Sequence, residues 1–461
     1  MRNLDNEFAS VGELDEFIRR NSGIEFIDAM FPDMCGIIRG KRLTLGHARQ
    51  LFSKGLQIPG SMLLLSVTGS CLDPLGRGVS DGDPDVLIRP IGGSLRVVPW
   101  GDRPRAQVQV GLLDETGGIN AFDPRQILAQ VAGRFDELGA RPVVACELEF
   151  CLIDSDISTA GTPRRPVLQS AAKRHSNTQL MSLSYIDDFG AFVEEVTSVC
   201  RDFSLPLTAI NAEYGGDQFE MNLHHVEDAV LSADHAISLK QIVQGVAAGQ
   251  GMRATFMAKP YDDKAGSGMH WHISMLNADG NNVFDDAEHE GSGVLEHAVA
   301  GVLDTMPEAM AFVAPNINSY KRFQPKTFVP MTRSWGYNNR SVAIRIPGGC
   351  SEDRRIEYRL PGSDANPYLA LAALLAGIHH GMTGRLTPPK PIEGRGCENP
   401  DHDLPLKLYD ALSVLRSASV LPDYLGHEYC SVYAECKRLE MEDFFAGLSA
   451  KEFRWYLRPD F

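Results

Sequence analysis

The segment YDDKAGSGMHWHISM, residues 261–275, places two histidines one residue apart directly after a glycine-serine-glycine turn. In a β-strand, successive side chains point to opposite faces of the sheet. One face of this segment is then apolar and consists of Met269, Trp271, Ile273 and Met275. The other face consists of Gly268, His270, His272 and Ser274. The segment therefore predicts a strand with one face in a core and one that binds metals or phosphates, although a solvated strand face fits these residues alone equally well.

Four other segments show the same two-faced pattern, at residues 141–152, 217–224, 340–347 and 354–361. In each of them apolar side chains alternate with polar or charged ones, the pattern of a half-buried strand. The polar faces carry Glu147 and Glu149; Gln218, Glu220, Asn222 and His224; Ser341, Ala343 and Arg345; and Arg355, Glu357 and Arg359.

Lysine is absent from all five polar faces, which concentrate glutamate, histidine and arginine instead. Carboxylates at close quarters repel one another unless cations neutralise them. Their oxygens, with a histidine, suit Mg²⁺ or Mn²⁺, and arginines on neighbouring strands suit the capture of phosphate and carboxylate groups. The pattern therefore favours phosphoryl transfer from a nucleotide at a site with several divalent ions over a merely solvated sheet.

Composition limits the class of protein. With 461 residues, 43% hydrophobic and 23% charged, the chain is typical of a globular protein of roughly two to three domains. The apolar run at residues 62–67 is far shorter than the about 20 residues that a membrane span needs, and the acidic, amphipathic start does not resemble a secretory signal. Nine cysteines without a CxxC pair predict reduced thiols and a cytoplasmic location. A net charge of −16 argues against nucleic acid as a partner.

The predicted secondary structure changes near residue 119. Before it, β-type segments dominate, and after it an amphipathic helix is predicted at 125–139, ended by glycine. A helix at 366–384 is apolar nearly all round, which predicts a position between packed layers, and the tail at 403–461 is predicted to be helical. We therefore expect a β-rich domain over 1–118 and an α+β domain over 119–461. The predicted β-type segments of the first domain are 23–45, 94–100 and 105–115.

Six motifs, taken in order, resemble the successive signatures of the glutamine synthetase family. They are ELEF, NAEYGGDQFE, ATFMAKPYDDKAGSGMHWHIS, NSYKRF, NNRSVAIRIP and RIEYRLPGSDANPYLALAALLAG. The resemblance extends from about residue 23 to the end of the chain. It implies an α+β fold with an N-terminal β-grasp domain and a catalytic antiparallel barrel surrounded by helices. It also implies a dodecamer of two hexameric rings, with each active site shared between neighbouring subunits.

The family's reaction is ATP-dependent: the γ-carboxylate of L-glutamate is phosphorylated, and a nitrogen nucleophile then displaces the phosphate. The resemblance implies one divalent ion, Mg²⁺ or Mn²⁺, held by Glu149, Glu213 and Glu220, and another held by Glu147, His270 and Glu357. It implies that glutamate is bound by Arg322, Arg359 and Gly266, the nucleotide by His272 and Ser274, and the phosphates by Arg340, Arg345 and Arg355. The direct catalytic roles would belong to Arg340, Glu213 and Arg359. For His272 a structural role remains the alternative.

The sequence departs from ammonia-using members of the family at the nitrogen site. Two acids that manage ammonium in those enzymes are replaced by Phe328 and Pro59, and the asparagine before the glycine-serine-glycine turn is Ala265. The loop that carries an adenylylated tyrosine in some bacterial enzymes is missing before LPLKLYDAL. AGSGMH, an arginine followed by FQP, and NNR after SWG instead resemble γ-glutamylputrescine and γ-glutamylpolyamine synthetases.

This closer resemblance implies a ligase that joins L-glutamate to a primary amine, with putrescine, spermidine or spermine expected, and a role in polyamine catabolism. The alternatives are a glutamine synthetase that uses ammonia, a ligase for ethanolamine, an alkylamine or an aniline, and an inactive relative that serves as a sensor or structural protein. Because all six metal positions hold competent ligands, the inactive relative is disfavoured. The amine's proton is expected to pass to Glu213 or to a phosphate oxygen. The acidic run with Asp81, Asp83 and Asp85 is a candidate contact for a distal ammonium group, but a solvated turn fits it better.

Overall fold

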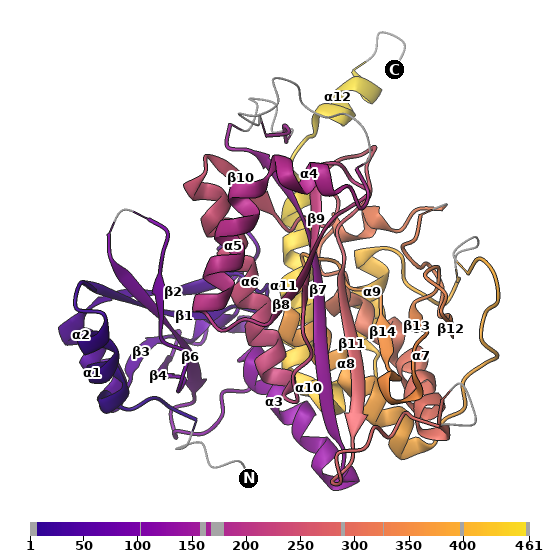
Figure 1. Cartoon of the computed structure of the whole chain (residues 1–461), viewed down its shortest axis with the longest axis horizontal. Helices are drawn as coiled ribbons and strands as arrows, with labels where there is room; N and C mark the ends of the chain where they lie inside the picture. The colour runs from indigo at the N-terminus through magenta and orange to yellow at the C-terminus, as the bar shows by residue number, and fades with distance from the viewer. Residues whose placement is uncertain are drawn as a thin grey trace.

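Two β-sheets organise the chain: the first lies at the left of Figure 1 and the second extends from the middle to the right, with helices between and behind them. The computed structural model describes residues 7–101, 103–156, 163–166, 179–286, 291–325, 327–396 and 401–457. We propose the division of the chain at residues 1–118 and 119–461, since the last strand of the first sheet ends at Leu113 and the next helix begins at Pro124.

The first sheet is a six-stranded mixed sheet in the order β2-β1-β6-β4-β3, with β5 paired to β6. The predicted pair of strands at 23–45 is confirmed as an antiparallel hairpin, and β1 also runs parallel to β6. This arrangement is the expected β-grasp domain. Its elements are α1 (Val11–Arg20), β1 (Phe26–Pro32), β2 (Ile38–Thr44), α2 (Leu45–Lys54), β3 (Leu56–Pro59), β4 (Asp85–Pro90), β5 (Arg96–Val98) and β6 (Arg105–Leu113).

The second sheet has eight strands in the order β12-β13-β14-β11-β7-β9-β8, with β10 paired to β7. Every pair is antiparallel except β12 with β13. The five segments predicted as two-faced strands are all here, as β7, β9, β11, β13 and β14. Among the described residues β8 and β12 do not pair, so the expected barrel is an open half-barrel. The bounds are β7 (Arg141–Asp154), β8 (Leu207–Ala212), β9 (Gln218–Leu223), β10 (Met252–Thr255), β11 (Met269–Leu276), β12 (Trp335–Tyr337), β13 (Ile344–Ile346) and β14 (Ile356–Tyr358).

Helices cover the half-barrel. The predicted helix at 125–139 is α3 followed by a 3-10 turn that ends at Gly139, where a φ of 58° favours glycine. The apolar helix predicted at 366–384 is α8, which is buried against α7, α3 and α6. The predicted helical tail is confirmed for α9 to α12, and residues 458–461 lie outside the described residues. The bounds are α3 (Pro124–Gly133), α4 (Leu183–Asp188), α5 (Gly190–Asp202), α6 (Ala229–Gly249), α7 (Gly293–Val313), α8 (Pro367–Gly384), α9 (Leu408–Arg416), α10 (Leu421–Leu425), α11 (His427–Ala446) and α12 (Ala450–Tyr456).

Strand β6 is buried on both faces, not only on the apolar face that its alternation predicts. Its polar face meets the second domain: Gln107 Nε2 donates to Gln241 Oε1 at 3.2 Å, and Gln109 Nε2 donates to Asp234 Oδ1 at 3.0 Å and to the Tyr368 hydroxyl at 2.7 Å. Burial of these amide nitrogens is offset by the hydrogen bonds that they donate. The apolar residues that alternate with these glutamines, Ala106, Val108 and Val110, are buried on the other face.

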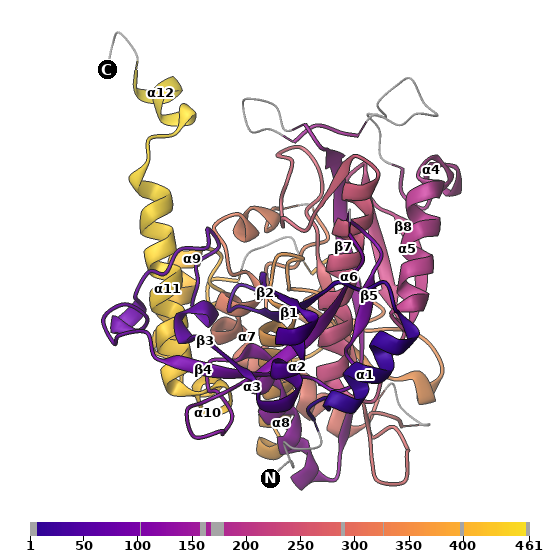
Figure 2. The ribbon, with the colours of Figure 1, turned by 90° about the vertical axis from the view of Figure 1, so that its left-hand side faces the viewer.

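The C-terminal helix α12 extends beyond the body of the protein, away from both sheets (Figure 2). Within the described part of the chain, no helix combines the length and the apolar character that crossing a bilayer requires.

Helices α7 and α8 cross closely at Gly301, and this contact yields a stability prediction. A Cβ atom at Gly301 would lie 2.1 Å from Gly377 O and 2.4 Å from Gly381 N, both backbone atoms of α8. The helices would have to separate, so Gly301→Ala is expected to lower the free energy of unfolding by about 1–3 kcal/mol. Gly293→Ala in the same helix meets nothing within 4 Å and is the control. Urea unfolding of both variants measures the difference, and equal midpoints would contradict the packing described.

Candidate active site

The register of the second sheet brings the predicted charged side chains together across five neighbouring strands. Directly opposite residues in an antiparallel pair have Cβ atoms about 4.5–5.5 Å apart, so their side chains interact. The alternating apolar residues of β7, β9 and β11 are completely buried on the other face of the sheet. The cross-strand partners on the polar face are Glu147 with His270, Glu149 with Glu220, His272 with Glu357, and Arg345 with Glu357.

Glu147 lies at the centre of this polar face. His270 Nδ1 lies 3.4 Å from its Oε2, His272 Nε2 lies 3.0 Å from its Oε1, and Asn222 Nδ2 donates to Oε1 at 3.1 Å. Two sets of three residues could each ligate a metal, because the ligand atoms within each set lie within 4.8 Å of one another. Glu147 belongs to both sets. The first set is Glu147, His272 and Glu357, and the second is Glu147, Glu220 and His270.

These two sets differ from the ligand sets that the family resemblance implies. His272 shares a set with Glu357 because the two residues are partners on adjacent strands. Arg355 Nε donates to His272 Nδ1 at 3.2 Å, which leaves Nε2 as the protonated nitrogen of a neutral ring. A protonated Nε2 is a donor and cannot ligate a metal, so this geometry favours His272 as a polar contact for a ligand, not a metal ligand.

The charges of the polar face are unevenly distributed. Burial, together with the nearby carboxylates, raises the pKa of Glu213 and of Glu220 to about 7. Burial also opposes ionisation of Glu357, but Arg359, the two histidines and Arg345 outweigh it and lower its pKa to about 2. Burial of Glu147 is likewise outweighed by hydrogen bonds from His270 and His272, which lower its pKa. Carboxylates that are buried beside one another form a donor set that fits a divalent cation.

Glu149 and the glycine-serine-glycine turn form one unit. Gly268 N donates to Glu149 Oε2 at 2.8 Å, and Arg322, which is 3% exposed, lies across the turn. A Cβ atom at Gly266 would lie 2.6 Å from Arg322 Cγ, and one at Gly268 would lie 3.1 Å from Arg322 NH2. The turn therefore needs glycine at both positions so that this arginine can reach the polar face.

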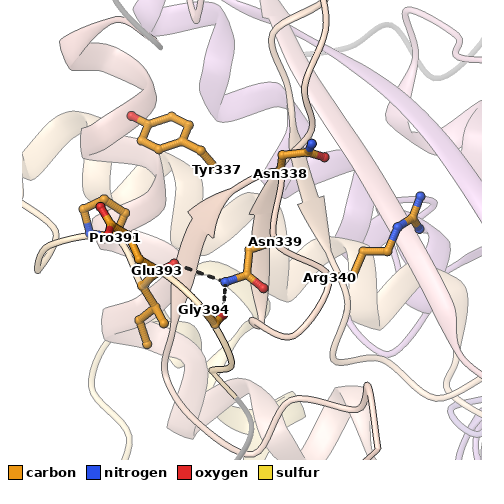
Figure 3. A pocket seen from close by; sticks show the side chains of 8 residues that line it. Tyr337, Asn338, Asn339, Arg340, Pro391, Glu393 and Gly394 are labelled. Atoms are coloured by element: carbon orange, nitrogen blue, oxygen red, sulfur yellow. Dashed lines mark hydrogen bonds between the residues drawn. The ribbon is translucent and has the colours of Figure 1, made fainter.

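Arg345 on β13 and Arg359, which directly follows β14, connect the carboxylates toward a pocket of about 790 Å³ (Figure 3). Arg359 and Arg345 both form ion pairs with Glu357, the latter at 2.6 Å, and Arg345 NH2 donates to Asn338 Oδ1 at 3.0 Å. In Figure 3 the guanidinium of Arg340 points away from the segment 391–394. The pocket is lined by Tyr337, Asn338, Asn339, Arg340, Pro391, Ile392, Glu393 and Gly394.

Two of the remaining predicted site residues lie on or directly beside the second sheet. Glu213 begins the turn between β8 and β9, and Ser274 is half-buried on β11 opposite Val143. Phe328 is 62% exposed in the loop that follows Arg322.

The acidic run with Asp81 and Asp83 forms hydrogen bonds within its own loop. Asp83 accepts hydrogen bonds from the backbone N and the hydroxyl of Ser61, and Asp81 accepts from Gly78 N and Asp83 N. This favours the solvated-turn reading.

Sequence reasoning missed three amide side chains that hold the carboxylates in place. Asn222 bonds to Glu147, Asn211 Nδ2 donates to Glu220 Oε1 at 3.2 Å, and Gln218 Nε2 donates to Glu149 Oε2 at 3.2 Å. Gln218 and Asn222 lie on a polar face that the alternation identifies, which was the available signal. Neutral amides carry no charge pattern, and Asn211 lies in a strand that was not predicted.

Comparisons with known proteins identify the family of this chain. Residues 121–456 match the glutamine synthetase catalytic domain family. The γ-glutamylputrescine synthetase PuuA of Escherichia coli strain K12 is 37% identical to this chain over 446 residues, which cover 97% of this chain and 94% of that protein. A glutamate–isopropylamine ligase of a Pseudomonas species is 31% identical, with 96% of each protein covered.

Among solved structures, GmaS without ligand matches with a TM-score of 0.82 at 29% sequence identity, covering 95% of this chain and 98% of that one. The fold, the ordered motifs and these relatives lead to one assignment. The chain belongs to the glutamine synthetase family and is an ATP-dependent γ-glutamyl ligase that forms carbon–nitrogen bonds.

Proposed function

We propose that this ligase joins L-glutamate to a polyamine through γ-glutamyl phosphate, with putrescine, spermidine or spermine as the amine. The observation that carries the proposal is Phe328, an aromatic side chain that is 62% exposed where ammonia-using members of the family carry an acid. The relative named γ-glutamylputrescine synthetase supports it. An apolar side chain suits the alkyl part of an amine better than a bare ammonium ion.

The reaction requires the negative charges of two substrates to be brought together. Glu147, His270 and Glu357 would hold one divalent ion, Mg²⁺ or Mn²⁺, and Glu149, Glu213 and Glu220 would hold another. When bound, such ions neutralise phosphate charge and polarise the transferring phosphoryl group. Arg340, Arg345 and Arg355 would bind the phosphates, and His272 and Ser274 would contact the nucleotide.

Glutamate would be oriented by the buried arginines and by the glycine turn. Arg322 would bind the α-carboxylate, Arg359 the γ-carboxylate, and the backbone of Gly266 the amino group. Preorganised hydrogen-bond donors such as these stabilise the charge that develops on the γ-carboxylate during phosphorylation. Both arginines are at least nine-tenths buried and are held by protein partners, Arg322 by the Leu360 carbonyl and Arg359 by Glu357.

The amine would approach beside Glu213, which is the proposed proton acceptor together with a phosphate oxygen. Met181 N donates to Ala212 O at 2.9 Å, which places Met181 next to the turn that carries Glu213. Met181 and Tyr214, which follows Glu213 in this turn, are exposed. Apolar surface beside the amine lowers its pKa by desolvation, as it does for a buried lysine, and so helps the nitrogen to lose its proton.

The proposal includes a cytoplasmic homo-oligomer, a dodecamer of two hexameric rings. The end of α11 and α12 expose large apolar side chains, a feature of surfaces that meet another protein. These residues are Phe444, Phe445, Leu448, Phe453, Trp455, Tyr456 and Leu457. Eight cysteines of the described residues are free thiols, which supports a reducing compartment.

A competition among amines tests the proposed function. The protein is incubated with ATP, Mg²⁺, glutamate and equal concentrations of ammonium, ethanolamine, isopropylamine, putrescine, spermidine and spermine. Mass spectrometry of the γ-glutamyl products is expected to show polyamine conjugates in excess. Glutamine as the main product would establish the ammonia alternative, and γ-glutamylisopropylamide would establish the alkylamine alternative that the Pseudomonas relative supports.

Phe328→Glu tests the proposed position of the amine. The new carboxylate would lie against the alkyl chain, so kcat/KM with putrescine is expected to fall about tenfold, or ~1.4 kcal/mol. Ammonium use need not become efficient, because Pro59 remains. Tyr409→Glu, which changes another exposed aromatic residue in α9, is the matched control. Unchanged turnover of putrescine by Phe328→Glu would show that Phe328 does not line the amine site.

A further inference from the structure

Gln218 is a buried glutamine at the start of β9, and only 1% of it is exposed. Its Oε1 accepts a hydrogen bond from Gly215 N at 2.7 Å, within the turn between β8 and β9. Its Nε2 lies within hydrogen-bond distance of three acceptors: Glu149 Oε2 at 3.2 Å, Gly266 O at 3.0 Å and Ser267 Oγ at 3.3 Å. An amide nitrogen has two hydrogens, so these acceptors occupy its full capacity.

The three acceptors belong to two parts of the candidate site. Glu149 is a proposed metal ligand, and Gly266 supplies the proposed backbone contact to glutamate. Glu149 Oε2 receives a second hydrogen bond from Gly268 N at 2.8 Å, so that oxygen is held by two donors and the orientation of the carboxylate is fixed. One side chain therefore connects a metal-binding carboxylate on β7 to the glycine turn before β11.

We propose that Gln218 is a positioning residue: it orients Glu149 toward a divalent ion and the Gly266 carbonyl toward the amino group of glutamate. This inference rests on the proposed function and deepens it. Hydrogen-bond partners outside the ligand shell that orient a ligand typically change metal affinity or activity by 10–100-fold when removed, an effect of about 1.4–2.8 kcal/mol.

A purely structural role is the competing explanation, because Gln218 also fastens the β8–β9 turn through Gly215. The two ends of the side chain separate these roles. Gln218→Met keeps the length and removes both ends. Gln218→Glu keeps an oxygen for Gly215 N but replaces the Nε2 donor that faces Glu149 and Gly266. The control is Gln107→Met, which removes a buried glutamine of the first sheet. The amide nitrogen of Gln107 donates one hydrogen bond, to Gln241.

The experiment combines Mn²⁺ titration by calorimetry with steady-state kinetics and thermal unfolding. Gln218→Met is expected to bind Mn²⁺ about 10–100-fold more weakly than wild type. Both Gln218 variants are expected to show a higher KM for glutamate, with a smaller change in the KM for ATP. Gln107→Met should retain the wild-type Mn²⁺ affinity and glutamate KM.

Wild-type Mn²⁺ affinity and glutamate KM in both Gln218 variants, with only a lower unfolding temperature, would overturn the inference. If Gln218→Met does not fold, the glutamate KM of Gln218→Glu decides, since that variant retains the contact to Gly215. If the wild-type protein makes no γ-glutamyl amide, the proposed function fails, but the Mn²⁺ titration of Gln218→Met against Gln107→Met still decides the role of Gln218.

Discussion

Glu147→Gln is expected to lower kcat by about 10³-fold, which corresponds to ~4 kcal/mol of transition-state stabilisation. Glu147 contacts both histidines of the polar face and belongs to both sets of possible ligand atoms. Glutamine keeps its shape and one oxygen but removes the charge that pairs with a divalent ion. Steady-state phosphate release with ATP, glutamate and putrescine measures the change.

The control for this variant is Glu352→Gln, which changes an exposed glutamate in a 3-10 turn before β14. Surface substitutions of this kind change stability by no more than about 0.5 kcal/mol. Circular dichroism should show that both variants are folded. Near-normal turnover by Glu147→Gln would show that this sheet face is only a solvated surface.

The second large effect is on stability, at the junction between the two domains. Asp234→Ala is expected to lower the free energy of unfolding by about 3 kcal/mol, because the buried Arg125 loses one of its two carboxylate partners and keeps only Glu7. Asp234 forms an ion pair with Arg125 at 3.0 Å and accepts a hydrogen bond from the Tyr368 hydroxyl at 2.6 Å. Arg125 and Tyr368 are buried, so water cannot replace the lost carboxylate.

Urea unfolding measures the effect of Asp234→Ala on stability. Asp304→Ala removes a more exposed carboxylate that pairs with His380 at 3.1 Å and is the matched control. Exposed pairs contribute between zero and about 1 kcal/mol, so this control should unfold close to wild type. Equal losses in the two variants would mean that the buried network around Asp234 stabilises the fold no more than an exposed ion pair does.

The strands of the polar face could be predicted because their side chains alternate every two residues. One face of each strand is apolar and the other is polar or charged, so the alternation is visible in the sequence. In β7, for example, Glu147 and Glu149 alternate with residues that are completely buried. The register was not predictable, since it depends on how β7, β9 and β11 meet across long stretches of chain. The proximity of Glu147 and His270 was implied only by the family resemblance, and the pairing of His272 with Glu357 appears only in the folded protein.

The burial of polar residues was the other feature that the sequence did not reveal. Gln109 alternates with valines in β6 and would face water if β6 belonged to an isolated sheet. It is buried because α6 and α8 supply Asp234 and Tyr368 as partners. Gln218 was overlooked for a similar reason: an uncharged amide becomes informative only when its acceptors, Glu149 and Gly266, are known.

The central claim is that this polar face transfers a phosphoryl group from ATP to the γ-carboxylate of glutamate, and oxygen labelling tests it most directly. Glutamate carrying the heavy oxygen isotope in its γ-carboxylate is incubated with the protein, ATP, Mg²⁺ and putrescine in ordinary water. The released phosphate is then analysed by mass spectrometry. Attack of the amine on γ-glutamyl phosphate predicts that each released phosphate carries one oxygen atom from glutamate. Phosphate without the label, formed while the γ-glutamyl amide accumulates, would contradict this account.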